Sequence, residues 1–318
     1  MLPSEPTTID CSEVSLLDIL AHLEARLAAG APSVTLRVLD PDLGPGRHAG
    51  ELVEHEGRRC VHRPLRVWVD LAERLGLRLA TPRPLEPGWL ALRFERLDAH
   101  ASWQRDDQAP ADRTEKYGTA SGYARIHKLE DPNLLLDVAD ALARMRLPAK
   151  PRILVLGVNA GDEFELLATL EPRLREQAEF VGIDHSASAI AAARARFPGP
   201  RHTLIEADVA RLPALALGRF DLVVALALLQ SPGIDDRALL RVLVQDVLQP
   251  SGALLLGIPN CRYVDGEQLH GARTRNHAQA ELSLVIKDVA FYKRYLQQHK
   301  RRVFVTGKYH VLVTAIAE

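Results

Sequence analysis

Hydrophobic residues follow helical and strand spacings through the first hundred residues of the chain, with turn-forming residues between them. The predicted elements are helices at residues 16–29 and 66–75, strands at 33–38, 77–80 and 89–96, and a loop rich in glycine and charge at 41–57. Gly30 and Gly76 directly follow the two helices, as is typical of helix ends. We therefore predict a small α/β domain at residues 1–100, and no motif in it indicates a function.

Residues 101–116 differ from the regions on either side because they are polar, charged and almost free of aliphatic side chains. Such a composition is typical of a linker. Beyond it, apolar residues between Leu134 and Met145 recur at helical spacing and predict a further helix. We place the domain boundary in this linker and a second domain at residues 117–318.

Short all-apolar runs alternate with helical patterns over the second half of the chain. The predicted strands are 153–156, 180–184, 203–206, 220–225 and 253–258, and the predicted helices between them are 162–170, 186–196 and 238–248. A helix at 282–298 and two strands at 302–306 and 310–316 follow. Apolar strands that alternate with helices predict a parallel sheet covered by helices on both faces.

A glycine-rich turn joins the first of these strands to its helix. Gly157 and Gly161 let the backbone turn tightly and approach a ligand, and the following helix presents its positive end there. Asp184 ends the next strand, where a carboxylate can accept hydrogen bonds from both hydroxyls of a ribose. A plain strand-to-helix turn and a helix cap explain each feature separately, but the combination favours a nucleoside ligand.

The successive motifs VLGVNAG, FVGID, EAD, FDLVVA and LQPSGALLLGIPN resemble those of class I S-adenosylmethionine-dependent methyltransferases. The resemblance covers about 170 residues, just over half of the chain. It implies an α/β fold with a seven-strand, doubly wound, Rossmann-like sheet that ends in an antiparallel hairpin. A nicotinamide-binding Rossmann domain is disfavoured, because that hairpin is not part of it and its fingerprint of three closely spaced glycines is absent.

The resemblance implies S-adenosyl-L-methionine as the cofactor and assigns its contacts. Gly157 and Gly161 would line its methionine and ribose portion, and Asp184 would hold the ribose. Asp208 would accept a hydrogen bond from the adenine amino group, with Val209 beside it. The complete predicted set is Gly157, Asn159, Gly161, Asp184, His185, Asp208, Val209 and Ala225.

Two positions depart from the family's pattern. Val155 stands where the family usually has an acidic residue that fixes the methionine ammonium, and Asn159 stands at the middle glycine. Asparagine tolerates a left-handed backbone, so this replacement is mild, whereas valine supplies no carboxylate. A non-catalytic cofactor-binding or scaffold protein therefore stays as an alternative to an enzyme.

The acceptor side of the site is expected in the segments after the fourth and fifth strands, at residues 227–232 and 259–265. The first segment reads ALLQSP and lacks the Asn-Pro-Pro-aromatic motif of many amino methyltransferases, which disfavours amino groups of bases and glutamine side chains as acceptors. Tyr117, Tyr123 and Arg125 are candidates to close over the ligand, with simple aromatic packing as the alternative.

No catalytic residue is assigned, because methyl transfer to an already nucleophilic atom needs mainly alignment and a base only when the acceptor must lose a proton. His127 and His185 are the candidates for such a base. A surface position explains each of them more simply.

The whole-chain charge of -1 gives no reason to expect a nucleic acid partner. One local exception lies near the end of the chain, where cations far outnumber carboxylates and aromatic residues stand between them. The cations considered for RNA are Lys293, Arg294, Lys300, Arg301 and Arg302. A solvated helix face and the turn after it explain this run equally well.

Composition adds bounds on size and location. The chain has 318 residues, of which 47% are hydrophobic, so it can bury a substantial core. Its three cysteines lie far apart without a metal or redox spacing, and we expect reduced thiols and no metal. Neither a signal sequence nor an apolar stretch of about 20 residues is found, so we expect a cytoplasmic protein without a membrane segment.

The favoured prediction is a two-domain, S-adenosylmethionine-dependent methyltransferase whose acceptor is unidentified, with a small molecule preferred. The amino-terminal domain is expected to recognise the substrate or a partner. The alternatives are a non-catalytic cofactor-binding or scaffold protein and an RNA-modifying methyltransferase that uses the basic segment.

Overall fold

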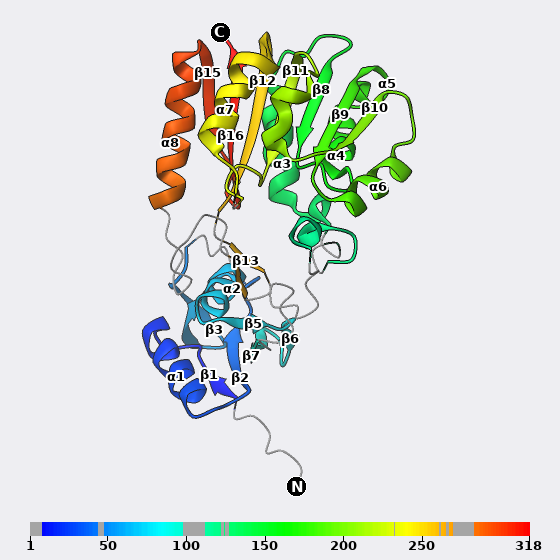
Figure 1. Cartoon of the computed structure of the whole chain (residues 1–318). Coiled ribbons are helices and arrows are strands. Elements are labelled where there is room, and N and C mark those ends of the chain that lie inside the picture. Colours follow the sequence, from blue (N-terminus) through cyan, green and yellow to red (C-terminus); the bar gives the residue numbers. More distant parts are fainter. Residues whose placement is uncertain are drawn as a thin grey trace. The chain divides into compact units, whose positions relative to one another are not determined.

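The structure is a computed structural model that describes residues 8–43, 48–97, 112–121, 124, 127–231, 233–260, 262–264, 267–269 and 283–318. The chain divides into two compact units, each considered by itself (Figure 1). The N-terminal unit comprises residues 1–105 and 263–269, and the C-terminal unit comprises residues 106–262 and 270–318. Residues 263–269 contain most of a short pair of strands, β13 (Arg262–Val264) and β14 (Glu267–Leu269).

The N-terminal unit is built on a mostly antiparallel sheet in the order β1-β2-β7-β5, with β6 also paired to β7. Its strands are β1 (Ile9–Asp10), β2 (Ser33–Leu39), β5 (Leu77–Leu79), β6 (Arg83–Pro84) and β7 (Trp89–Arg96). Helices α1 (Leu16–Ala28) and α2 (Leu65–Arg74) contribute Leu23 and Trp68 to the same core as Leu36 and Leu92 of the sheet. The predicted helices and strands of this region are confirmed.

A hairpin of β3 (Glu51–His55) and β4 (Arg58–His62) occupies part of the predicted loop at 41–57, so that prediction was wrong there. Glu56 and Gly57 form its turn, both with positive φ, which suits the right-handed twist of a two-residue hairpin. Glutamate is an uncommon first residue for such a turn, and the usual Asn-Gly or Asp-Gly signal is therefore absent.

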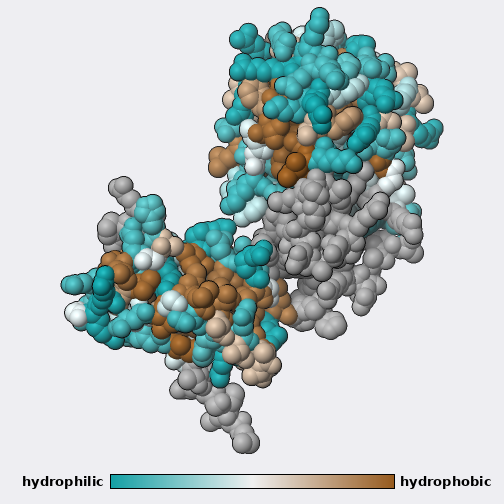
Figure 2. Space-filling model, turned by 90° about the vertical axis from the view of Figure 1, so that its left-hand side faces the viewer, coloured by the Kyte–Doolittle hydropathy of each residue, from teal (hydrophilic) through white to brown (hydrophobic). Residues whose placement is uncertain are grey.

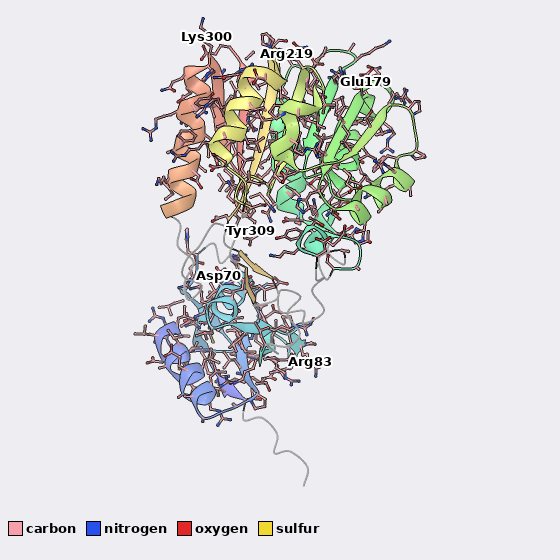
Figure 3. All side chains as sticks on the ribbon, in the orientation of Figure 1. Asp70, Arg83, Glu179, Arg219, Lys300 and Tyr309 are labelled. Atoms are coloured by element: carbon pink, nitrogen blue, oxygen red, sulfur yellow. The ribbon has the colours of Figure 1, made fainter. Side chains whose placement is uncertain are left out.

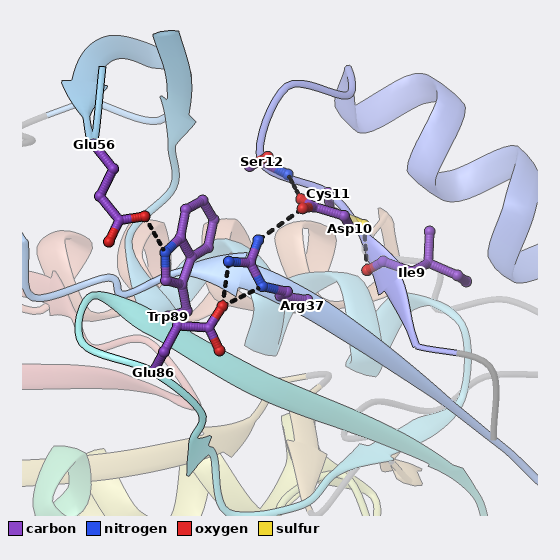
Figure 4. A network of polar contacts seen from close by, with 8 residues as sticks. All are labelled: Ile9, Asp10, Cys11, Ser12, Arg37, Glu56, Glu86 and Trp89. Atoms are coloured by element: carbon purple, nitrogen blue, oxygen red, sulfur yellow. Dashed lines mark hydrogen bonds and ion pairs between the residues drawn. The ribbon is translucent and has the colours of Figure 1, made fainter. Parts of the chain in front are cut away.

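A closed polar network ties the edge of this unit together (Figure 4). Arg37 on β2 donates to Asp10 at 2.7 Å and to Glu86 at 2.9 Å, and its guanidinium carbon lies 3.5 Å from the centre of the buried Trp89 ring. The indole N–H of Trp89 donates to Glu56 at 3.3 Å. Because the charged and aromatic groups satisfy one another, this network stabilises the fold.

Hydrophobic residues also gather on the visible face of the N-terminal unit in Figure 2. The large hydrophobic side chains that this unit exposes include Leu16, Leu17, Leu52, Leu65 and Leu85.

The C-terminal unit holds a seven-strand sheet, as predicted, and its strands lie in the order β10-β9-β8-β11-β12-β16-β15. The strands are β8 (Arg152–Leu156), β9 (Glu179–Asp184), β10 (His202–Glu206), β11 (Phe220–Leu226), β12 (Leu248–Pro259), β15 (Arg301–Thr306) and β16 (His310–Ala317). The strands from β8 to β12 pair in parallel, and β16 pairs antiparallel with both β12 and β15.

Helices cover both faces of this sheet because its strands are apolar on both sides. One core packs α3 (Pro132–Ala143), α4 (Asp162–Leu170), α5 (Arg173–Gln177) and α6 (Ala187–Arg196) against the sheet. The other packs α7 (Asp236–Val242), a π-helical turn at Leu243–Val247 and α8 (Ser283–Gln298). The predicted α/β, doubly wound fold is confirmed.

None of the helices in the described part of the chain is both long and apolar enough to cross a membrane.

Candidate cofactor site

The loop between β8 and α4, residues 157–161, carries three left-handed backbone positions. The φ angles of Gly157, Asn159 and Gly161 are +71°, +46° and +92°. Asparagine is one of the few side chains that tolerate this conformation, so Asn159 keeps the turn that the family makes with a middle glycine. A Cβ at Gly161 would lie 2.4 Å from the Phe197 ring, so Gly161 is required by packing against the end of α6 as well as by its φ.

The backbone N–H groups of this loop are all used inside the protein. Gly157 and Val158 donate to Ile183, Asn159 donates to Asp184, Ala160 donates to the side chain of Asn159, and Gly161 donates to Val158. A loop that binds phosphate groups points free N–H groups at its ligand. Loop 157–161 offers none, which favours a ligand held by side chains at the strand ends.

Asp184 is the central side chain of this site. Its Oδ2 accepts the Asn159 N–H at 2.9 Å and its Oδ1 accepts the Ser186 N–H at 3.0 Å, and the residue is only 9% exposed. Each carboxylate oxygen has a second lone pair, so Asp184 can hold the loop and still accept two hydroxyl groups. His185, the next residue, is exposed.

Asp208 and Val209 follow β10, the strand beside β9. The Ala207 N–H donates to the Asp184 carbonyl at 2.9 Å, which brings the two acidic positions to the same edge of the sheet. Asp208 is exposed and accepts the Ala210 N–H at 2.8 Å, while Val209 is buried.

Ala225 is fully buried in β11, where it pairs with Leu156 and Leu256 inside the core. Ala225 pairs with the residue that precedes loop 157–161, and its side chain packs in the core. Val155 is likewise fully buried in β8, between Gly182 and Val224 of the neighbouring strands.

A buried carboxylate that the sequence analysis missed lies just beyond the loop. Glu163, in the first turn of α4, is 2% exposed and accepts a hydrogen bond from Lys128 at 2.7 Å. Acidic residues are common in the first turn of any helix, so its sequence position gave no sign of a special role.

The short helix η2 (Arg113–Tyr117) packs on the start of α6 next to Asp184. The Ser186 hydroxyl donates to Glu115 at 3.0 Å and the Ser188 N–H donates at 3.2 Å, and the Ser188 hydroxyl donates as well. These bonds, led by that from the Ser188 side chain, lower the pKa of Glu115. Part of the segment predicted as a linker thus forms a short helix that is bonded to the start of α6.

Tyr117 contacts the loop through its backbone, because its carbonyl accepts the Asn159 side-chain N–H at 2.7 Å. The residue as a whole is 37% exposed. Tyr123 and Arg125 lie outside the described residues. His127 is exposed at the start of the short helix η4 (Lys128–Glu130).

The expected acceptor side contains a buried hydrogen-bonded chain. Gln230 donates to the Tyr292 hydroxyl at 3.4 Å, and that hydroxyl donates to Asp236 at 2.6 Å. All three side chains are buried, so these hydrogen bonds fix the segment after β11 onto α7 and α8. Pro232, Cys261 and Asp265 fall outside the described residues.

One of the five cations considered for RNA is not on the surface. Arg301 is 5% exposed and donates to the Gly252 carbonyl and, at 2.9 Å, to the Gln249 carbonyl. Burial lowers its pKa. The prediction that Arg301 belongs to an exposed basic patch was therefore wrong, whereas Lys293, Arg294, Lys300 and Arg302 are exposed.

This fold and this loop, with an acidic residue at each of two neighbouring strand ends, are typical of nucleoside-binding α/β domains. Residues 153–252 match a family described as "Methyltransferase domain". This match, over about a third of the chain, supports a class I S-adenosylmethionine-dependent methyltransferase domain in the C-terminal half.

Two curated relatives are each named trans-aconitate 2-methyltransferase. The one from Delftia acidovorans is 35% identical over 125 residues, 39% of this chain and 44% of the relative. The one from Paracidovorax citrulli is 30% identical over 178 residues, 56% of this chain and 62% of the relative. The chain thus matches less than two thirds of the length of either relative.

Among solved structures, a SAM-dependent methyltransferase from Aquifex aeolicus is similar with a TM-score of 0.42 and 18% identity, covering 60% of this chain and 96% of that one. A likeness at this level does not bear on the acceptor.

Proposed function

We propose that this protein is a methyltransferase that uses S-adenosylmethionine to methylate a small molecule. The observation that carries the proposal is Asp184, a carboxylate at the tip of β9 that the Asn159 N–H and the Ser186 N–H hold in place. Asp184 is bonded to loop 157–161, whose N–H groups are all used within the protein. Both lie in the region that matches a methyltransferase family.

The residues of the site fit the cofactor part by part. Asp184 would accept the ribose hydroxyls, and Asp208 would accept the adenine amino group. Gly157 would line the portion of the cofactor between ribose and methionine. A Cβ at this position would lie 3.3 Å from Leu228, so the space beside it is already narrow. The bound cofactor supplies a methyl group on a positively charged sulfur, so the protein must align an acceptor and exclude water.

A carboxylate oxygen is the first acceptor class that we propose. The names of the two curated relatives point to a tricarboxylate. An ionised carboxylate is already nucleophilic and needs no base, which agrees with a site whose two candidate histidines are exposed. The segment held by Gln230 would face the acceptor, and the N-terminal unit would recognise the substrate or a partner.

A thermal-shift titration with S-adenosylmethionine and S-adenosylhomocysteine tests the cofactor. We expect saturable stabilisation of the wild type and its loss in Asp184→Ala. Glu179→Ala is the matched control, because Glu179 begins the same strand at the far end of the sheet (Figure 3) and forms an exposed ion pair with Arg152. No shift of the wild type with either ligand would refute the proposal.

Transfer is tested separately by following S-adenosylhomocysteine release with trans-aconitate and a panel of other small carboxylic acids. Turnover with a carboxylic acid would support the acceptor class. Cofactor binding without turnover on any acceptor would instead support the non-catalytic alternative, in which Val155 marks a site that has lost its catalysis.

A further inference from the structure

The buried Glu163 carboxylate has only part of the hydrogen bonding that its charge requires. Its Oε1 accepts Lys128 Nζ at 2.7 Å, but its Oε2 is buried without a hydrogen-bond partner in the described structure. An ionised carboxylate has about four acceptor positions, and a buried one left unpaired is destabilising. Such a group in a native fold calls for an explanation, and a ligand donor is one.

Its position in the fold connects Glu163 to the cofactor site. Gly161 caps helix α4, which begins at Asp162, so Glu163 follows loop 157–161 by two residues. The next residue, Phe164, packs against Phe180 and Phe197 in the core. Glu163 instead contacts Lys128 of η4, which packs against α4.

The same site lacks an acidic residue on its first strand. Val155 stands there and is fully buried among apolar side chains, so it offers nothing to a cation. The methionine end of S-adenosylmethionine carries an ammonium group with three donors. A positive group beside loop 157–161 therefore needs an acceptor from elsewhere in the chain.

We propose that Glu163 Oε2 binds the α-ammonium group of the cofactor and takes the place of the carboxylate that Val155 lacks. This inference rests on the proposed function. Lys128 acts as a positioning residue, since its bond to Oε1 fixes the carboxylate and directs the second oxygen to the ligand. The cofactor ammonium then supplies the hydrogen-bond donor that Glu163 Oε2 otherwise lacks.

Calorimetry with two ligands tests this assignment. S-adenosylhomocysteine carries the amino-acid end, whereas 5′-methylthioadenosine shares the nucleoside and sulfur without it. We expect Glu163→Gln to weaken S-adenosylhomocysteine binding by about 10- to 100-fold, the range for a lost charge-assisted hydrogen bond, and to leave methylthioadenosine binding unchanged within about twofold.

The matched control is Glu165→Gln, which removes an exposed carboxylate of the same helix that pairs with Arg196. It should bind both ligands as the wild type does. Glu163→Asp keeps the charge on a shorter side chain, so we expect a smaller loss that is again confined to S-adenosylhomocysteine. Retained methylthioadenosine binding shows that each variant is folded.

Three results would overturn the inference. Unchanged S-adenosylhomocysteine affinity in Glu163→Gln would show that Oε2 does not bind the ligand. An equal loss for both ligands would assign Glu163 a purely structural role. A wild type that binds neither ligand would refute the proposed function itself, and the inference with it.

Discussion

Two clusters of charged side chains, one in each unit, differ in how completely they are satisfied. In the N-terminal unit, Arg37 meets Asp10 and Glu86 and lies on the Trp89 ring, whose N–H is also bonded. In the C-terminal unit, Glu163 is bonded at one oxygen and bare at the other. In a closed network the polar groups satisfy one another, so the network stabilises the fold without a ligand. In an open network one buried group still lacks a partner, and a ligand can supply it.

The largest expected effect falls on the closed network. Trp89 is 1% exposed, so Trp89→Ala should lower the free energy of unfolding of the N-terminal unit by about 3–5 kcal/mol. Trp68 is 1% exposed in the core of this unit, so its fluorescence reports urea unfolding of the unit.

Leu85→Ala serves as the control, because Leu85 is 47% exposed and should cost less than about 0.5 kcal/mol. We also expect Trp89→Ala to bind S-adenosylhomocysteine as the wild type does. A clear loss of affinity for S-adenosylhomocysteine would show that the closed network contributes to ligand binding as well as to stability.

Arg37→Met tests how much the charge of Arg37 contributes to the stability of this network, and we expect a moderate effect. The methionine retains most of the apolar contact with Trp89 but removes the bonds to Asp10 and Glu86, which are themselves partly exposed. We expect a loss of about 0.5–2 kcal/mol from the cation–π contact, to which the solvent-screened ion pairs add little. The fluorescence-monitored urea midpoint should fall without a change in slope. A loss as large as that of Trp89→Ala would mean that charge, and not burial, dominates this network.

Most of the C-terminal sheet could be predicted from the sequence, because all-apolar strands between amphipathic helices leave few other arrangements. The hairpin at β3 and β4 could not, since its Glu56-Gly57 turn lacks the common turn residues. Asp184 was found because it ends an apolar strand after a glycine loop.

Two misses at charged positions share one physical cause. Arg301 and Arg302 are neighbours in β15, where successive side chains point to opposite faces, so one is buried and the other exposed. Sequence shows the run of charge but not which member faces inward. In the same way, Glu163 looks like an ordinary acidic residue of a first helical turn, and only its burial and its bare oxygen distinguish it.

The smallest predicted effect concerns Glu115, a charged group of the C-terminal unit that is bonded as fully as the N-terminal network. Hydrogen bonds from Ser188 and Ser186 hold its pKa below the usual value of a glutamate in the folded protein. A lowered carboxyl pKa stabilises the fold above the unfolded value and loses that contribution as the pH falls through the folded value. Thermal unfolding followed by circular dichroism between pH 7 and about pH 3 should therefore show a shallower acid loss in Glu115→Gln than in the wild type. In Glu179→Gln, which removes an exposed carboxylate at the start of β9, the acid loss should equal that of the wild type.

Glu115 is hydrogen-bonded within the protein, so Glu115→Gln should bind S-adenosylhomocysteine normally at pH 7, unlike Glu163→Gln. Equal losses of affinity in the two variants would show that the bonding of a carboxylate within the protein does not decide whether it binds the ligand.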